Sequence, residues 1–101
     1  MSVVSRIPSD VMSAEELRAL DAAHQYAILS DLYGEIKRLA DIKTLAIDAH
    51  ASARIVVLRA PEPAHKARVI EAKRDIDVVS AAIAARKLQI SVLQTLLRAA
   101  Q

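Results

Sequence analysis

Two pairs of a carboxylate and a histidine are the residues of this sequence whose types and spacing come closest to chemistry. Asp21 and His24 stand three residues apart, as do Glu62 and His65. Side chains at this spacing share a helix face, and such pairs help to hold di-iron sites in four-helix bundles. The second pair straddles two prolines, and no bridging glutamates are evident on matching turns. We therefore expect no metal site, and we interpret both pairs, with His50, as solvated polar residues near helix ends or on the surface.

Other catalytic arrangements are excluded by composition. The chain has no cysteine, so it lacks thiol nucleophiles and thiolate metal ligands. Its single glycine cannot build a loop that cradles phosphate groups. The serines stand singly along helical patterns rather than in a nucleophile elbow. We predict that the protein is not an enzyme and binds no cofactor; a small helical enzyme with its pocket at a dimer interface is the alternative.

A cluster of basic residues is the candidate site for an anion. It consists of Lys66, Arg68, Lys73 and Arg74. Glu71, Asp75 and Asp77 are interleaved with it at spacings typical of helix-stabilising ion pairs, which argues against direct binding of nucleic acid. Binding of an anionic ligand or nucleic acid by an oligomer therefore remains the alternative function rather than the first one.

The only aromatic residues, Tyr26 and Tyr33, stand seven apart and so lie on one face of a helix. Tyrosines often anchor interfaces, and a recognition surface is one interpretation. We favour ordinary packing, with each hydroxyl at the edge of the packed region.

The composition predicts an all-α protein. Hydrophobic residues make up 53% of the chain but aromatic residues only 2%, and there is one glycine and no asparagine. Long helices with few turns fit this pattern better than a sheet, which needs frequent turn residues. Neither a signal peptide nor an apolar run long enough for a membrane span is evident, so we expect a cytoplasmic protein, either of the producing cell or of an infected host.

The first helix is expected to begin after an extended arm at residues 1–12. Ser13 and Glu16 form a capping box, and the helical pattern then continues without proline over 14–59. Gly34 is its only weak point. We favour one long helix, kinked or straight at this position. The alternative is a monomeric three-helix bundle in which the chain reverses at Gly34.

The clear break in the helical pattern is the bend at 60–63. Pro61 and Pro63 cannot both lie inside a helix, whereas Pro63 can occupy the first position of the next one. The second helix is then expected over 64–100. Together the two helices predict a single domain at 13–101, folded as an antiparallel hairpin.

Apolar residues form two stripes on the second helix, roughly half a turn apart. We assign one stripe, with part of the first helix, to the core within the chain: Ile36, Leu39, Ile42, Val69, Ile76, Val79, Ile83, Ile90, Leu93 and Leu97. We assign the other stripe to an interface with another subunit or partner: Val78, Ala81, Ala85, Leu88, Val92 and Leu96. One neighbouring helix covers only one stripe, so the pattern predicts an oligomeric helical bundle.

The charge distribution also favours association. The segment 10–35 holds six acidic residues and one basic residue, while the segment 36–101 holds twelve basic and six acidic ones. Opposite charges at the two ends favour pairing within a chain or between chains. We therefore predict a non-enzymatic helical interaction protein: a self-assembling structural component, an adaptor or a small inhibitor. Small alanine-rich proteins of this kind are common in phages and mobile elements, an origin that the sequence allows.

Overall fold

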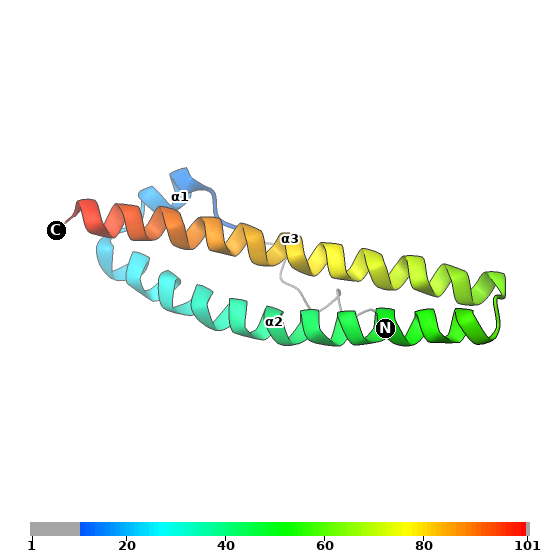
Figure 1. Cartoon of the computed structure of the whole chain (residues 1–101). Helices are drawn as coiled ribbons and strands as arrows, with labels where there is room; N and C mark the ends of the chain where they lie inside the picture. Colours follow the sequence, from blue (N-terminus) through cyan, green and yellow to red (C-terminus); the bar gives the residue numbers. More distant parts are fainter. Residues whose placement is uncertain (1–10, 101) are drawn as a thin grey trace.

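Two long antiparallel helices form the body of the protein. The computed structural model describes residues 11–100, which form α1 (Ala14–Arg18), α2 (Ala22–Arg59) and α3 (Pro63–Ala99). Helices α2 and α3 lie side by side over their whole length, and the molecule is about 60 Å long and 19 Å wide (Figure 1). The predicted all-α fold and the hairpin of two long helices are confirmed.

The start of α1 follows the predicted capping box. The Glu16 backbone N–H donates to Ser13 Oγ at 3.2 Å, and the Ser13 backbone N–H donates to Glu16 Oε1 at 3.3 Å. Val11 and Met12 precede α1 without helical structure. The rest of the predicted arm, residues 1–10, lies outside the described residues.

The prediction of one uninterrupted helix over 14–59 is wrong, because the chain leaves the helical path between Arg18 and Ala22. Asp21 caps the new helix: its Oδ1 accepts a hydrogen bond from the backbone N–H of His24 at 2.9 Å. The break folds α1 back against α3, where Leu17 becomes fully buried. A straight helix would carry Leu17 away from the hairpin, so burial of this side chain outweighs helical continuity.

The alternative in which the chain reverses at Gly34 is also wrong. Helix α2 runs through Gly34 without interruption, and the residue has no positive φ. The third helix comes from the break before Asp21 instead.

The proline bend lies where the sequence predicted it, and only Ala60, Pro61 and Glu62 separate α2 from α3. Pro63 is the first residue of α3, as predicted. The ring nitrogen Nδ1 of His65 donates to the carbonyl oxygen of Ala60 at 2.8 Å, which ties the first turn of α3 to the end of α2. No helix among residues 11–100 has the length and apolar character needed to cross a membrane.

The core is concentrated at the end of the hairpin that carries α1. Leu17, Leu32, Ile90 and Leu93 form its centre. Of the predicted core residues, the structure buries Leu39, Val79, Ile90, Leu93 and Leu97, and half-buries Ile36, Ile42, Val69, Ile76 and Ile83. The five half-buried residues include both of those nearest the bend, Val69 and Ile76, so burial declines toward that end.

Candidate interaction surfaces

The half of the hairpin next to the bend, residues 45–78, has one buried side chain, Ala46 at its edge. From Ile47 to Val78 no side chain is buried. Large aliphatic side chains are instead exposed on both helices: Leu45, Ile47, Ile55, Val56, Leu58, Ile70 and Val78. Because α1 packs only at the other end, nothing within residues 11–100 covers them. We call this half of the molecule the bend half.

The interface stripe predicted on α3 is divided by α1. Val92 and Leu96 are half-buried and pack against the cluster that contains Leu17. Farther along α3 the same stripe lies open: Val78, Ala81 and Leu88 are exposed, and Ala85 is half-buried. The chain's own third helix thus covers one end of the stripe and leaves the other end uncovered.

An apolar strip extends into the bend half along the flank of the hairpin that carries α1. On α3, steps of seven residues lead from Val92, beside α1, to Ala85 and Val78. On α2, the same steps lead from Asp31, which lines a pocket with Met12, to Leu45. Seven residues make nearly two full turns, so each series stays on one flank. We define the apolar strip as Leu45, Ala49, Val56, Val78, Ala82 and Ala85.

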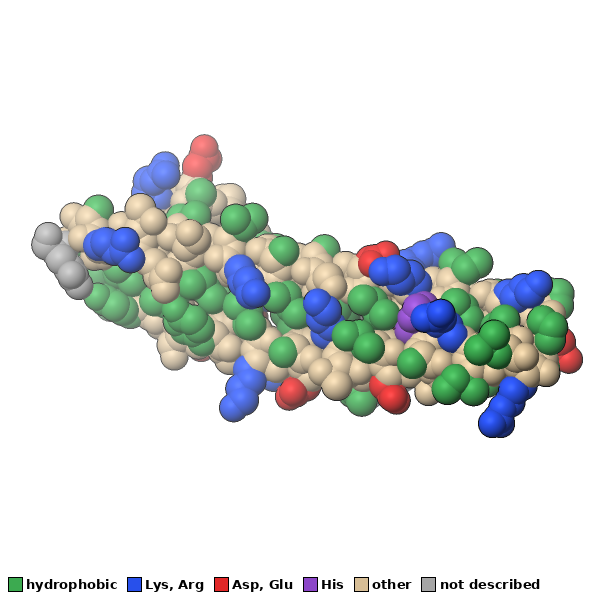
Figure 2. All heavy atoms as spheres, in the orientation of Figure 1, with side chains coloured by type: hydrophobic (Ala, Val, Ile, Leu, Met, Phe, Trp, Pro, Cys, Tyr) green, Lys and Arg blue, Asp and Glu red, His purple; other side chains and the backbone are tan. Residues whose placement is uncertain are grey.

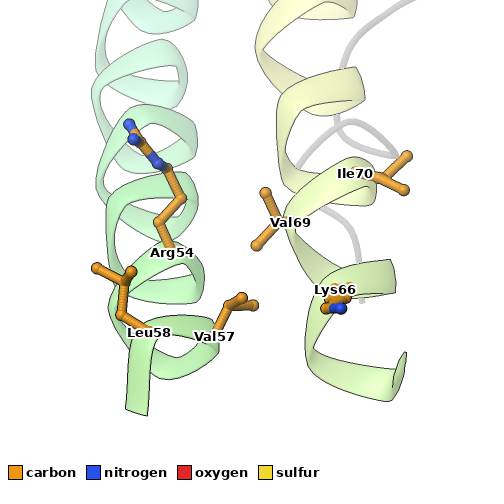
Figure 3. A pocket seen from close by; sticks show the side chains of 6 residues that line it. All are labelled: Arg54, Val57, Leu58, Lys66, Val69 and Ile70. Atoms are coloured by element: carbon orange, nitrogen blue, oxygen red, sulfur yellow. The ribbon is translucent and has the colours of Figure 1, made fainter. Parts of the chain in front are cut away.

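A groove of about 330 Å³ opens between the helices beside the bend, on the flank away from α1. In Figure 3, Val57 and Val69 point toward one another across the gap between α2 and α3. Leu58 and Ile70 border the groove, and Leu58 is 84% exposed. Arg54 and Lys66 complete its lining with two positive charges. The groove is therefore apolar inside and basic at its edges.

The structure separates the four basic residues that the sequence grouped together. Lys66 and Lys73 are seven apart and share a flank of α3, whereas Arg68 and Arg74 point to other sides of the helix. All four are exposed, and Lys73 Nζ lies 3.1 Å from Asp77 Oδ1.

Lys66 and Lys73 belong instead to a larger basic face, built by both helices. We define the basic face as Lys43, Arg54, Lys66, Lys73, Lys87 and Arg98. It is turned toward the reader in Figure 2, where Lys and Arg side chains follow the length of the molecule, while α1 lies behind α3 in Figure 1. This face has no signal in the sequence, because its members come from two helices and are never neighbours in the chain.

Tyr26 and Tyr33 lie on the same flank as the basic face. The Tyr33 hydroxyl accepts a hydrogen bond from Gln94 Nε2 of α3 at 2.8 Å. Tyr26 lines a pocket of about 230 Å³ together with Gln94 and Arg98. About half of each tyrosine side chain is exposed to solvent.

Arg86, the one charged residue within the apolar stripe of α3, is buried. Its Nε lies 3.4 Å from Glu35 Oε2, and its Nη1 donates to the Ala82 carbonyl oxygen at 3.1 Å. The pair links α2 to α3 on the flank that carries α1. A buried guanidinium needs such partners, since its desolvation is costly.

Both carboxylate–histidine pairs lie at helix starts and make local contacts there. Asp21 caps α2, and its pKa is lowered because the His24 backbone N–H and then the His24 ring donate hydrogen bonds to it. Glu62 Oε2 lies 3.8 Å from His65 Nε2 at the bend. His50 is half-buried on α2. Within residues 11–100 no group of three His, Cys, Asp or Glu residues is placed to hold a metal ion.

Comparison of the chain with protein-family models, with curated proteins and with solved structures gives no match.

Proposed function

We propose that this protein is a non-enzymatic helical interaction protein whose bend half associates with a second copy of itself. The observation that supports this proposal is that no side chain between Ile47 and Val78 is buried, although seven large aliphatic residues of the bend half are exposed. Full burial of one Leu, Ile or Val side chain contributes about 1.5–3 kcal/mol. Covering several of them on each of two copies gains a free energy comparable to the cost of association, which is about 4–15 kcal/mol.

The apolar strip is the surface that we assign to this contact. Along the same stripe, the side chains of Val92 and Leu96 already accept a helix, namely α1. Two bend halves packed antiparallel through Leu45, Val56 and Val78 would form a four-helix bundle with the two-fold symmetry that is commonest among homo-oligomers. The α1 ends, which have their own core, would extend from this bundle on either side.

Charge favours the apolar strip over the opposite flank. Two copies of the basic face would bring Arg54, Lys66 and Lys73 against their equivalents, which is unfavourable. The strip is bordered by charges of both signs, among them Arg68, Glu71 and Asp75, and these can pair across a two-fold axis.

The test compares two aspartate substitutions in one helix. Leu45 and Ile47 are 59% and 49% exposed, so neither substitution disturbs a core, but they lie on opposite flanks of α2. Light scattering and sedimentation at 0.15 M and 1 M salt should show a dimer for the unmodified protein and for Ile47→Asp. Leu45→Asp should be a monomer with unchanged helix content by circular dichroism.

The proposal fails if the unmodified protein is a monomer at micromolar concentration. It also fails if the dimer dissociates in 1 M salt, since an apolar contact resists screening. Dissociation by Ile47→Asp but not by Leu45→Asp would show that a different flank is used and would contradict the assignment to the apolar strip.

A further inference from the structure

The basic face is continuous along the whole hairpin. On α2, steps of seven residues join Tyr26 and Tyr33 to Arg54, and on α3 they join Lys66 and Lys73 to Lys87 and Gln94. The two series meet at both ends: Arg54 and Lys66 line one groove beside the bend, and Tyr33 bonds to Gln94 at the other end. From Lys66 to Arg98 the face extends about 48 Å at 1.5 Å per residue.

Its charge differs from that of the opposite flank. Asp77, which pairs with Lys73, is the only acid at the positions that build this face: 26, 33, 40, 43, 47 and 54 on α2, and 66, 70, 73, 77, 80, 84, 87, 91, 94 and 98 on α3. The opposite flank carries Asp31, Glu35, Glu71 and Asp75 among its basic residues. A long row of cations with few acidic residues beside it attracts a long anion to that side.

The tyrosines indicate which polyanion fits. All the aromatic residues of the chain lie on this face, and both rings are half exposed beside Arg98 and Gln94. The hydrogen bond from Gln94 fixes the position of the Tyr33 ring. Aromatic rings within a basic groove are typical of surfaces that bind single-stranded nucleic acid, because unstacked bases pack on the rings while phosphates contact Lys and Arg. A duplex offers no free base surface to such rings.

We infer that the basic face binds single-stranded nucleic acid, with a base at the pocket formed by Tyr26, Gln94 and Arg98 and with the phosphate backbone extending along α3 toward Lys66. This is a second surface, distinct from the apolar strip. It lies on the other flank of the hairpin, so a dimer formed through the strip leaves it accessible.

The chain provides its own optical probe for this test. It contains two tyrosines and neither tryptophan nor phenylalanine, so its intrinsic fluorescence reports on Tyr26 and Tyr33 alone. Titration with a 15-nucleotide oligo(dT) should quench this fluorescence, after correction for absorption by the oligonucleotide. Anisotropy of a labelled oligonucleotide should show affinity that falls about 50-fold from 50 mM to 200 mM salt if four phosphates are contacted.

Charge variants test the face with a matched control. The double variant Lys66→Glu/Lys87→Glu should lose at least tenfold in affinity. Lys37→Glu/Arg74→Glu changes the net charge equally at exposed positions outside the basic face and should lose less than threefold. All four side chains are exposed, so folding should be retained, which circular dichroism checks.

Ring variants separate stacking from simple charge attraction. Tyr26→Leu and Tyr33→Leu should each weaken binding roughly tenfold, whereas Tyr26→Phe keeps the ring and should bind as the unmodified protein does. The inference is overturned if oligo(dT) does not bind at 50 mM salt, or if both charge variants lose affinity equally. Competition by polyglutamate as strong as that by the oligonucleotide would overturn it as well, since this would show a surface for acidic polypeptides.

Discussion

Single residues in this protein act mainly by ending helices and by joining them. Asp21 caps the start of α2, and this cap offsets part of the free energy that the break after α1 costs. Glu35 and Arg86 join α2 to α3 within a stripe that is otherwise apolar. The sequence shows Arg86 as an exception to its stripe, but the partner carboxylate stands 51 residues away and has no local signal.

The Asp21 cap predicts a pH dependence of stability. The pKa of Asp21 is lowered in the folded protein, so its carboxylate stabilises the fold above the ordinary pKa, and this stabilisation is lost as pH falls through the lowered value. Asn caps helices as well as Asp does but does not titrate in this range. Between pH 5 and pH 3, Asp21→Asn should therefore lose less stability in urea unfolding than the unmodified protein. An identical loss in both would show that Asp21 does not contribute to the acid sensitivity.

At the scale of elements, much of the hairpin could be predicted and the break in the first helix could not. The spacing of Pro61 and Pro63 admits one interpretation, and the capping box at Ser13 depends only on neighbours in sequence. The break before Ala22 depends on Leu17 meeting Leu32, Ile90 and Leu93, which are distant in the chain. Asp21 is of a residue type that caps helices, but neither glycine nor proline accompanies it to indicate a break.

Of the candidate surfaces, too, one could be predicted from the sequence and another could not. An uncovered apolar stripe on α3 follows from helical periodicity, and Val78 and Leu88 are indeed exposed. The packing of α1 against Val92 and Leu96 depends on the break before Ala22, which was not predicted. The basic face could not be predicted because it requires the register between α2 and α3, which places Arg54 beside Lys66 and Tyr33 beside Gln94.

Gly34 gives a direct measure of how well α2 tolerates its one glycine. A Cβ atom added there would meet only Arg38 Nη1, at 3.6 Å, which is an ordinary contact. Gly34→Ala should therefore raise the free energy of unfolding by about 0.5–1 kcal/mol, because alanine loses less backbone entropy in a helix. The measurement is the midpoint of urea unfolding at constant slope. A lower midpoint would mean that α2 bends at Gly34 in solution.

At the scale of the whole molecule, the two halves of the hairpin differ because α1 packs against only one of them. The half that carries α1 has a core, and the bend half lacks one. Leu17 is fully buried, and its side chain holds α1 against α3. The same helix covers Val92 and Leu96, so it limits the length of the stripe that remains open to a partner. In the proposed dimer, folding and association would therefore be coupled through this five-residue helix.

This coupling predicts opposite effects of Leu17→Ala on stability and association. Loss of the buried side chain should lower the free energy of unfolding by about 2–5 kcal/mol. Detachment of α1 should expose Val92 and Leu96, which extends the apolar surface and should give larger or tighter assemblies in sedimentation at 1 M salt. Arg18→Ala, an exposed position on the same helix, serves as the control and should change neither property. If Leu17→Ala destabilises the protein without strengthening association, the surface beneath α1 is not equivalent to the apolar strip.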